Sequence, residues 1–407
     1  MDISSRVRLF NLFLRGATIG LKFALSIIII NELGVEEYGT FGIFQSTVII
    51  MTFIVGFDFY SFSSREILKK EAKPFSFYFK HQLLFYLLSY FFVIPFSFFL
   101  VKLDIVEKEH LFLFILILVA EHLSQELYRI LILLKKSIVG TMVLFLRSGI
   151  WIIVLYVLWQ INFVAKNINA LLILWLFGAA FSLVVGFRKT NFTWVKELDF
   201  DWIKKGIVIA LPFFVGTIMY KLIEFSGRYF LKFYFSDKEV GIFTFFSSIS
   251  NILFVFVQTI VIIEIYPRLL ESRKKNFREF MIVFKVYKKQ LLQYTFLGII
   301  LSSVFIYPLL LFMNKTVLLS NIISYFVLLI AMSFFCVSFI SHYALYSYSR
   351  DFQILKATAI GFTINIVASF LLIPTYGVLG ASIAQVLSFL SLFISKLYFW
   401  KIYKENL

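Results

Sequence analysis

Three charged residues lie inside one apolar stretch that is long enough to cross a lipid bilayer. The stretch is residues 207–232, and its charges are Lys221, Glu224 and Arg228. At about 100° per residue in an α-helix, the three fall on one face. A charge at the bilayer centre costs roughly 2.5–3.5 kcal/mol or more, so this face should point into protein or water. We interpret the stretch as one helix of a multi-span transporter with a polar interior.

Basic residues exceed acidic ones in the apolar stretches. Arg15 and Lys22 are separated by nearly two helical turns and therefore share one face of the first stretch. Such residues suit an anionic substrate, because Arg holds phosphate oxygens bidentately and Lys supplies a point charge. The predicted substrate-binding residues of a basic cavity are Arg15, Lys22, Arg147, Lys221 and Arg228.

The candidate ion-coupling groups are the carboxylates in or beside the same stretches. They are Glu224, Asp58, Glu121, Glu126 and Glu264. Glu224 is the deepest, but its basic neighbours favour its charged form and so oppose protonation. For Asp58 and Glu264, near predicted helix ends, the alternative is snorkelling toward the interface.

Ion pairing within a helix is the alternative role for the deeper charges. Glu126 and Arg129 have the i,i+3 spacing of such a pair. Glu224 and Arg228 have the i,i+4 spacing, so we expect Arg228 to be the partner of Glu224. If these pairs form, the remaining basic residues give the interior a net positive charge.

The composition of the chain is that of a membrane protein. Of its 407 residues 61% are hydrophobic and 15% charged, with a mean hydropathy of +0.91, whereas soluble domains are about 45–50% apolar and 25% charged. We expect an all-α fold with twelve transmembrane helices. The apolar stretches are 9–32, 38–62, 78–101, 110–134, 138–160, 168–187, 206–231, 239–266, 290–312, 320–346, 353–374 and 377–400.

The distribution of Lys and Arg predicts the orientation of these helices. With the amino terminus inside, 25 of the 39 basic residues fall in cytoplasmic segments and six in outer loops. The positive-inside rule therefore favours N-in and C-in, and it accounts for the net charge of +16 without nucleic acid. We expect two six-helix bundles around a central cavity: residues 1–190, a cytoplasmic linker at 191–205, and residues 206–407 with an amphipathic cytoplasmic loop at 267–289.

A short internal repeat supports two related halves. The turn after the first stretch reads GVEEYGTFGIFQS (34–46), and the turn after the seventh reads SDKEVGIFTFFSS (236–248). Both place a Glu two residues before a Gly and then aromatic residues and Ser. The turns lie six stretches apart, as a duplication of six-helix halves requires.

The carboxy-terminal turn, within INIVASFLLIPTYGVLGASIAQVLS, resembles a signature of the Wzx-type polysaccharide (O-antigen) flippases. These belong to the multidrug/oligosaccharidyl-lipid/polysaccharide (MOP) superfamily, and the chain is also similar in length and span order. The matching residues of this and the two earlier turns are Gly34, Gly39, Gly241, Asn365, Pro374, Tyr376, Gly377 and Gly380.

The resemblance implies a MATE-like fold and a role in surface polysaccharide assembly. Such a flippase moves an undecaprenyl-pyrophosphate-linked oligosaccharide, for O-antigen or capsule, from the cytoplasmic to the outer leaflet of the bacterial cytoplasmic (inner) membrane. It works by alternating access, with H⁺ or Na⁺ as coupling ion and other polysaccharide assembly proteins as partners. The sequence predicts no enzyme activity, no cofactor and no metal site, since it has no P-loop, one cysteine (Cys336) and four scattered histidines.

Two alternatives remain at this stage. A cation-coupled multidrug exporter of the same superfamily would have the same span count, but its cavity for cations should be acidic. A membrane glycosyltransferase or polymerase usually carries a large outer loop, and the outer loops here are short. The Asp199-Phe200-Asp201 sequence has the DxD form of some glycosyltransferases, yet we expect Asp201 to cap the helix that follows it.

Overall fold

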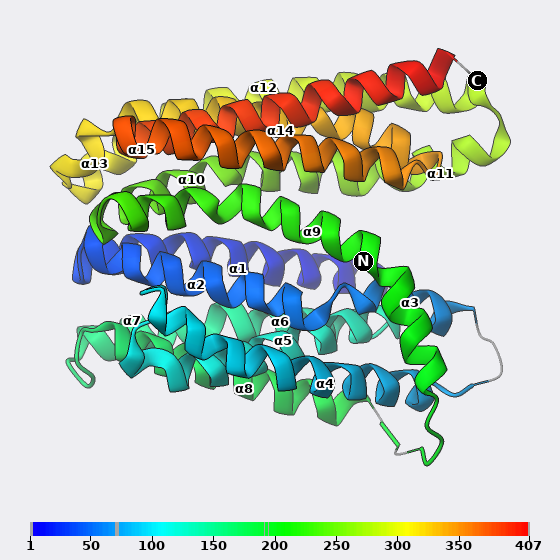
Figure 1. Cartoon of the computed structure of the whole chain (residues 1–407), viewed down its shortest axis with the longest axis horizontal. Coiled ribbons are helices and arrows are strands. Elements are labelled where there is room, and N and C mark those ends of the chain that lie inside the picture. Colours follow the sequence, from blue (N-terminus) through cyan, green and yellow to red (C-terminus); the bar gives the residue numbers. More distant parts are fainter. Residues whose placement is uncertain (1–2, 70–72, 191, 194, 406–407) are drawn as a thin grey trace. The chain divides into compact units, whose positions relative to one another are not determined.

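The chain folds into long helices (Figure 1). The computed structural model describes residues 3–69, 73–190, 192–193 and 195–405, without the side chains of residues 3–6 and 8, and no strand occurs among them. By contacts the chain forms two compact units. The first comprises Met1–Glu37 with Ile43–Ile218, and the second comprises Tyr38–Gly42 with Met219–Leu407.

The helices up to the middle of the chain are mostly of spanning length. They are α1 (Ile3–Glu32), α2 (Val35–Gly56), α3 (Phe59–Leu68), α4 (Phe75–Lys102), η1 (Lys108–His110), α5 (Leu111–Leu133), α6 (Ser137–Phe145), η2 (Leu146–Ile150), α7 (Trp151–Gln160), α8 (Ile168–Thr190) and α9 (Phe200–Tyr234). The segment η2 is a turn of π-helix that joins α6 and α7 into one continuous span.

The remaining helices contain the longest elements of the chain. They are α10 (Asp237–Val257), the π-helical η3 (Gln258–Ile262), α11 (Ile263–Lys275), α12 (Phe277–Met313), α13 (Thr316–Ser320), α14 (Ile322–Ser347) and α15 (Asp351–Glu405). Within the described residues eleven helical segments are long and apolar enough to cross a membrane. The twelve predicted stretches all fall on these segments, with the last two together on α15, and the chain is a multi-pass integral membrane protein.

The continuous α15 is in fact two antiparallel helices. Fifty-five residues at 1.5 Å each would far exceed the ~30 Å bilayer core, and Gly377 breaks the helix with φ 52° and ψ −126°. Ser388 Oγ donates to the carbonyl of Gly361 at 2.9 Å, which requires the chain to fold back near Gly377. Figure 1 shows the red second half lying beside the orange first half. The expected twelve-span architecture is thereby recovered.

Glycine is required twice at this turn, in two different ways. Gly377 has a positive φ that residues with a Cβ rarely adopt. A Cβ on Gly380 would lie 2.3 Å from the carbonyl oxygen of Leu372, so only glycine lets the returning helix start this close to the first. These contacts give a physical reason for the glycines in the flippase-like signature.

The structure differs from the predicted boundaries in three places. The stretch 38–62 is interrupted at Phe57 and Asp58, which both have left-handed backbone conformations and separate α2 from α3. The linker is shorter than predicted because α9 begins at Phe200. The residue that caps this helix is Asp199 rather than Asp201, since Asp199 Oδ1 accepts a hydrogen bond from the backbone N–H of Trp202 at 2.8 Å. The loop 267–289 is helical, as the end of α11 and the start of α12, with buried Leu269, Phe280, Phe284 and Tyr287 on its apolar side.

The repeated turns meet through matching positions. In the repeat, Gly39 corresponds to Gly241 and Gly42 to Thr244. A Cβ on Gly39 would lie 1.8 Å from the carbonyl oxygen of Asp237 and 2.9 Å from the Gly241 nitrogen, and one on Gly42 would lie 2.8 Å from Thr244 Oγ1. The starts of α2 and α10 therefore pack against each other, with each glycine next to its own counterpart.

Candidate functional site

Two exposed basic side chains lie on α1 within its membrane span. Arg15 donates to the hydroxyl of Tyr128 at 3.3 Å. Lys22 makes no hydrogen bond or ion pair with the part of the chain that the structure describes, and it lies about 15 Å along the helix from Glu32 at the end of the span. Because an ammonium at this depth is costly in lipid, we expect Lys22 to face protein or water rather than lipid.

A second basic group lies next to this face of α1. Arg147 is buried in the π-helical turn η2, and its Nε is 3.5 Å from a carboxylate oxygen of Glu121 on α5. The other carboxylate oxygen of Glu121 accepts a hydrogen bond from Trp175 Nε1 on α8 at 2.6 Å. Lys22 is close enough to interact electrostatically with both Arg147 and Glu121. One carboxylate therefore faces two cations in the first unit.

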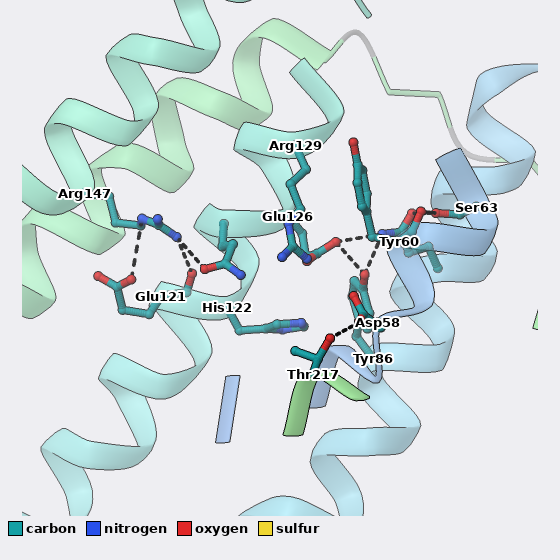
Figure 2. A network of polar contacts seen from close by, with 12 residues as sticks. Asp58, Tyr60, Ser63, Tyr86, Glu121, His122, Glu126, Arg129, Arg147 and Thr217 are labelled. Carbon is teal, nitrogen blue, oxygen red and sulfur yellow. Dashed lines mark hydrogen bonds and ion pairs between the residues drawn. The ribbon is translucent and has the colours of Figure 1, made fainter. Parts of the chain in front are cut away.

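The buried carboxylate of Glu126 forms the other polar centre of the first unit (Figure 2). One oxygen accepts hydrogen bonds from Tyr86 at 2.6 Å and Gln82 at 3.0 Å, and the other pairs with Arg129 at 2.6 Å. The predicted Glu126–Arg129 pair is confirmed. Three donors therefore contact the two oxygens of Glu126.

Asp58 and His122 lie beside this network, as Figure 2 shows. Asp58 is half-buried at the start of α3 and accepts a hydrogen bond from Thr217 on α9 at 2.6 Å. His122 is fully buried, with Nδ1 2.7 Å from the Tyr90 hydroxyl and Nε2 facing Gly56. Asp58 therefore lies at a helix break inside the first unit.

In the second unit the pairing on α9 differs from the expectation. The salt bridge of Glu224 is with Lys221 at 2.7 Å, one turn before it, whereas Arg228 donates to the carbonyl of Gly42 at 3.3 Å and lies over the ring of Phe225. Arg228, which was expected to pair with Glu224, interacts with it electrostatically, while the salt bridge of Glu224 is with the half-buried Lys221. The buried Arg228 is also oriented by the backbone of α2 at the repeated turn.

The other predicted positions divide between surface and packing roles. Glu264 forms an exposed pair with Arg268 at 3.2 Å, with both side chains more than 60% exposed, consistent with its place near a helix end. Asn365 is buried and accepts a hydrogen bond from Ser226 Oγ at 2.5 Å, which ties the first half of α15 to α9. Gly34, at φ 104°, precedes the first residue of α2.

Several polar contacts of the site could not be found from charge alone. The neutral partners of Glu121 and Glu126 come from neighbouring helices: Trp175 donates to Glu121, and Gln82 and Tyr86 donate to Glu126, with Ser63 donating in turn to Gln82. Thr217 donates to Asp58 in the same way. Uncharged polar residues are common throughout this chain, so their number gives no signal in the sequence. Lys396, in the second half of α15, is buried.

Comparison with solved structures identifies the fold. A multidrug-resistance MATE family transporter of the MOP superfamily, in an inward-facing conformation, matches with a TM-score of 0.75 at 13% identity over 96% of this chain and 94% of its own. The lipid II flippase MurJ, in an inward closed conformation, matches with a TM-score of 0.76 at 13% identity over 97% and 87%. The MATE multidrug transporter DinF-BH, in complex with R6G, matches with a TM-score of 0.66 at 16% identity over 100% and 96%.

No protein-family model matches the sequence, and no curated protein matches it either. At 13–16% identity the structural similarity establishes the fold, which is that of MOP superfamily transporters. The neighbours span both drug transport and lipid flipping.

Proposed function

We propose that the chain is a flippase for a polyprenyl-pyrophosphate-linked oligosaccharide in surface polysaccharide biosynthesis. It would move the lipid-linked repeat unit from the cytoplasmic to the outer leaflet of the bacterial cytoplasmic membrane by alternating access. The pyrophosphate carries the negative charge that makes unassisted passage through hydrocarbon prohibitive. The protein's task is to replace the lost solvation of that group.

The observation that carries this proposal is the exposed Lys22 in the middle of α1. Glu126 is occupied by Arg129, and Glu121 is shared between Trp175 and Arg147. Lys22 is thus a cation at membrane depth without a carboxylate of its own, and Arg15 adds a second exposed charge on the same helix. Such a face attracts an anion and repels a cationic drug.

A cation-coupled multidrug exporter is the second candidate. It is favoured by the fold, which this chain shares with a multidrug-resistance MATE family transporter and with the MATE multidrug transporter DinF-BH. It would require a carboxylate to face the cationic drug, and Asp58 and Glu224 are the half-buried candidates. Both proposals need H⁺ or Na⁺ as a coupling ion, but they differ in the sign of the charge on the substrate.

The test is transport of an undecaprenyl-pyrophosphate oligosaccharide by proteoliposomes. Lys22→Gln should reduce flux about tenfold or more, because a hydrogen bond to a charged group contributes about 1.5–3 kcal/mol. Lys22→Arg should retain most of the flux. The double variant Arg147→Gln/Glu121→Gln removes the second cation without leaving a buried carboxylate unpaired, and it should also be impaired.

The matched control is Lys238→Gln, which removes one exposed positive charge at the start of α10. It should transport like the wild type at equal protein level. Wild-type flux in Lys22→Gln and in the Arg147/Glu121 double variant would refute a basic substrate path. The second candidate would be favoured if the wild type exported a cationic dye and did not flip the lipid-linked sugar, and if Lys22→Gln exported the dye equally well.

A further inference from the structure

The second unit contains a buried lysine that neither proposal uses. Lys396, in the second half of α15, is 3% exposed, although it lies about 13 Å along the helix from Glu405. A lysine this close to a helix end could reach the interface by extending its side chain. It turns inward instead, so its position is set by packing inside the unit.

The surroundings of Lys396 are aromatic. Its Nζ lies 5.4 Å from the centre of the Phe339 ring on α14, and it makes no hydrogen bond or ion pair with the residues that the structure describes. Phe339 packs in turn against Phe335 and Phe254, with ring centres 5.0 and 5.1 Å away. A desolvated cation–π contact contributes about 2 kcal/mol, less than the several kcal/mol needed to bury an ammonium ion. Burial of Lys396 beside Phe339 therefore penalises the charged ammonium form.

A second base shares the Phe339 ring. His342 is one turn further along α14, with its ring centre 5.2 Å from that of Phe339, and it interacts electrostatically with Lys396. Its Nδ1 is buried without a hydrogen-bond partner. Lys396 and His342 are thus two bases that disfavour each other's charged forms.

No carboxylate lies at this pair among the described residues. The titratable groups that the described contacts place around Phe339 and His342 are phenols and a thiol: Tyr266, Tyr287, Cys336, Tyr343 and Tyr346. These groups are neutral near pH 7. Asp351 interacts electrostatically with Tyr266. The pocket also offers no set of oxygen ligands of the kind that alkali or alkaline-earth cations need. A proton is therefore the ion that the pair can bind.

We propose that Lys396 and His342 form a proton-binding site inside the second unit, through which a pH gradient drives transport. In this scheme the pair loses its proton where it is buried, and takes up one proton when the unit opens to water. Closing the pocket again expels that proton. This inference rests on the proposed transport function, but proton binding itself can be measured without a substrate.

The first experiment follows the thermal unfolding of the purified full-length chain between about pH 6 and pH 10, below the ordinary pKa of lysine. A pocket that favours the neutral amine binds fewer protons folded than unfolded, so stability should rise with pH. Lys396→Met keeps the apolar volume and should lose most of this rise relative to the wild type. Lys401→Met, an exposed lysine on the same helix, should keep it. An unchanged pH dependence in Lys396→Met would overturn the proposal.

The second experiment measures flux of the lipid-linked oligosaccharide into proteoliposomes, with and without an imposed pH gradient and in the absence of sodium. The gradient should stimulate the flux of the wild type and of Lys401→Met. It should also stimulate the flux of His342→Gln, but with an altered pH profile. Lys396→Met should retain its basal flux and lose the stimulation. Stimulation at the wild-type level in Lys396→Met would refute the coupling role. A wild type with no flux at all would instead count against the proposed function, and the unfolding experiment would still decide the proton site.

Discussion

At the scale of residues, the two carboxylates of α5 in the first unit each form an ion pair with an arginine. Lys22 forms no ion pair with the described residues. Glu126 is the most fully satisfied group, with Arg129, Tyr86 and Gln82 around it. Its spacing to Arg129 could be predicted because the partner lies on the same helix. The partners from other helices could not, since they depend on how the helices pack.

We predict that Glu126→Gln lowers the free energy of unfolding by about 3 kcal/mol, because it leaves Arg129 without its counterion in a buried network. The measurement is the unfolding midpoint in detergent. The double variant Glu126→Gln/Arg129→Gln should recover part of the loss. Glu264→Gln, which breaks an exposed pair, should change stability by less than about 0.5 kcal/mol. Equal effects of Glu126→Gln and Glu264→Gln would contradict this account of the network.

At the scale of elements, hydropathy locates the spans, and backbone geometry decides how they end. The apolar pattern predicted separate stretches at 353–374 and 377–400, and the structure joins them by the single turn at Gly377. The interruption at Phe57 and Asp58 could not be predicted from the sequence, because neither residue type marks a helix break in the way that glycine does. The π-helical turn that holds Arg147 is likewise invisible in the sequence, since it shifts the helix by one residue without altering composition.

The turn of α15 yields a prediction about glycine. Gly380→Ala should destabilise the protein and lower its yield in the membrane, because the added Cβ would meet the Leu372 carbonyl at 2.3 Å. Gly16→Ala on α1 is the matched control: a Cβ there meets no atom within 4 Å, so that variant should be neutral or slightly stabilising. Stability and expression measured side by side test the difference. Similar behaviour of the two variants would mean that the close approach at Gly380 is not required.

At the scale of the whole molecule, the bias of Lys and Arg predicts that both termini face the cytoplasm. The single cysteine makes this testable, because Cys336 is buried and can be replaced by Ser. In that background, Lys102→Cys should react with a membrane-impermeant maleimide in intact cells, and Lys274→Cys only after the membrane is opened. Both positions are exposed at helix ends, so accessibility alone cannot explain a difference. The reverse pattern would invert the topology and with it the direction of transport proposed here.

The close contact at the repeated turn carries information about the history of the chain. Gly39 approaches Gly241 as well as the carbonyl of Asp237, and Gly42 approaches Thr244, so two positions of one turn meet the same positions of the other. Contacts between identical positions are what a two-fold axis produces in a homodimer. This is the contact expected if a half-length ancestor paired with itself through this turn before duplication and fusion joined the copies. Thr244 then marks where the second copy has diverged, while Gly42 still provides the space that its side chain occupies.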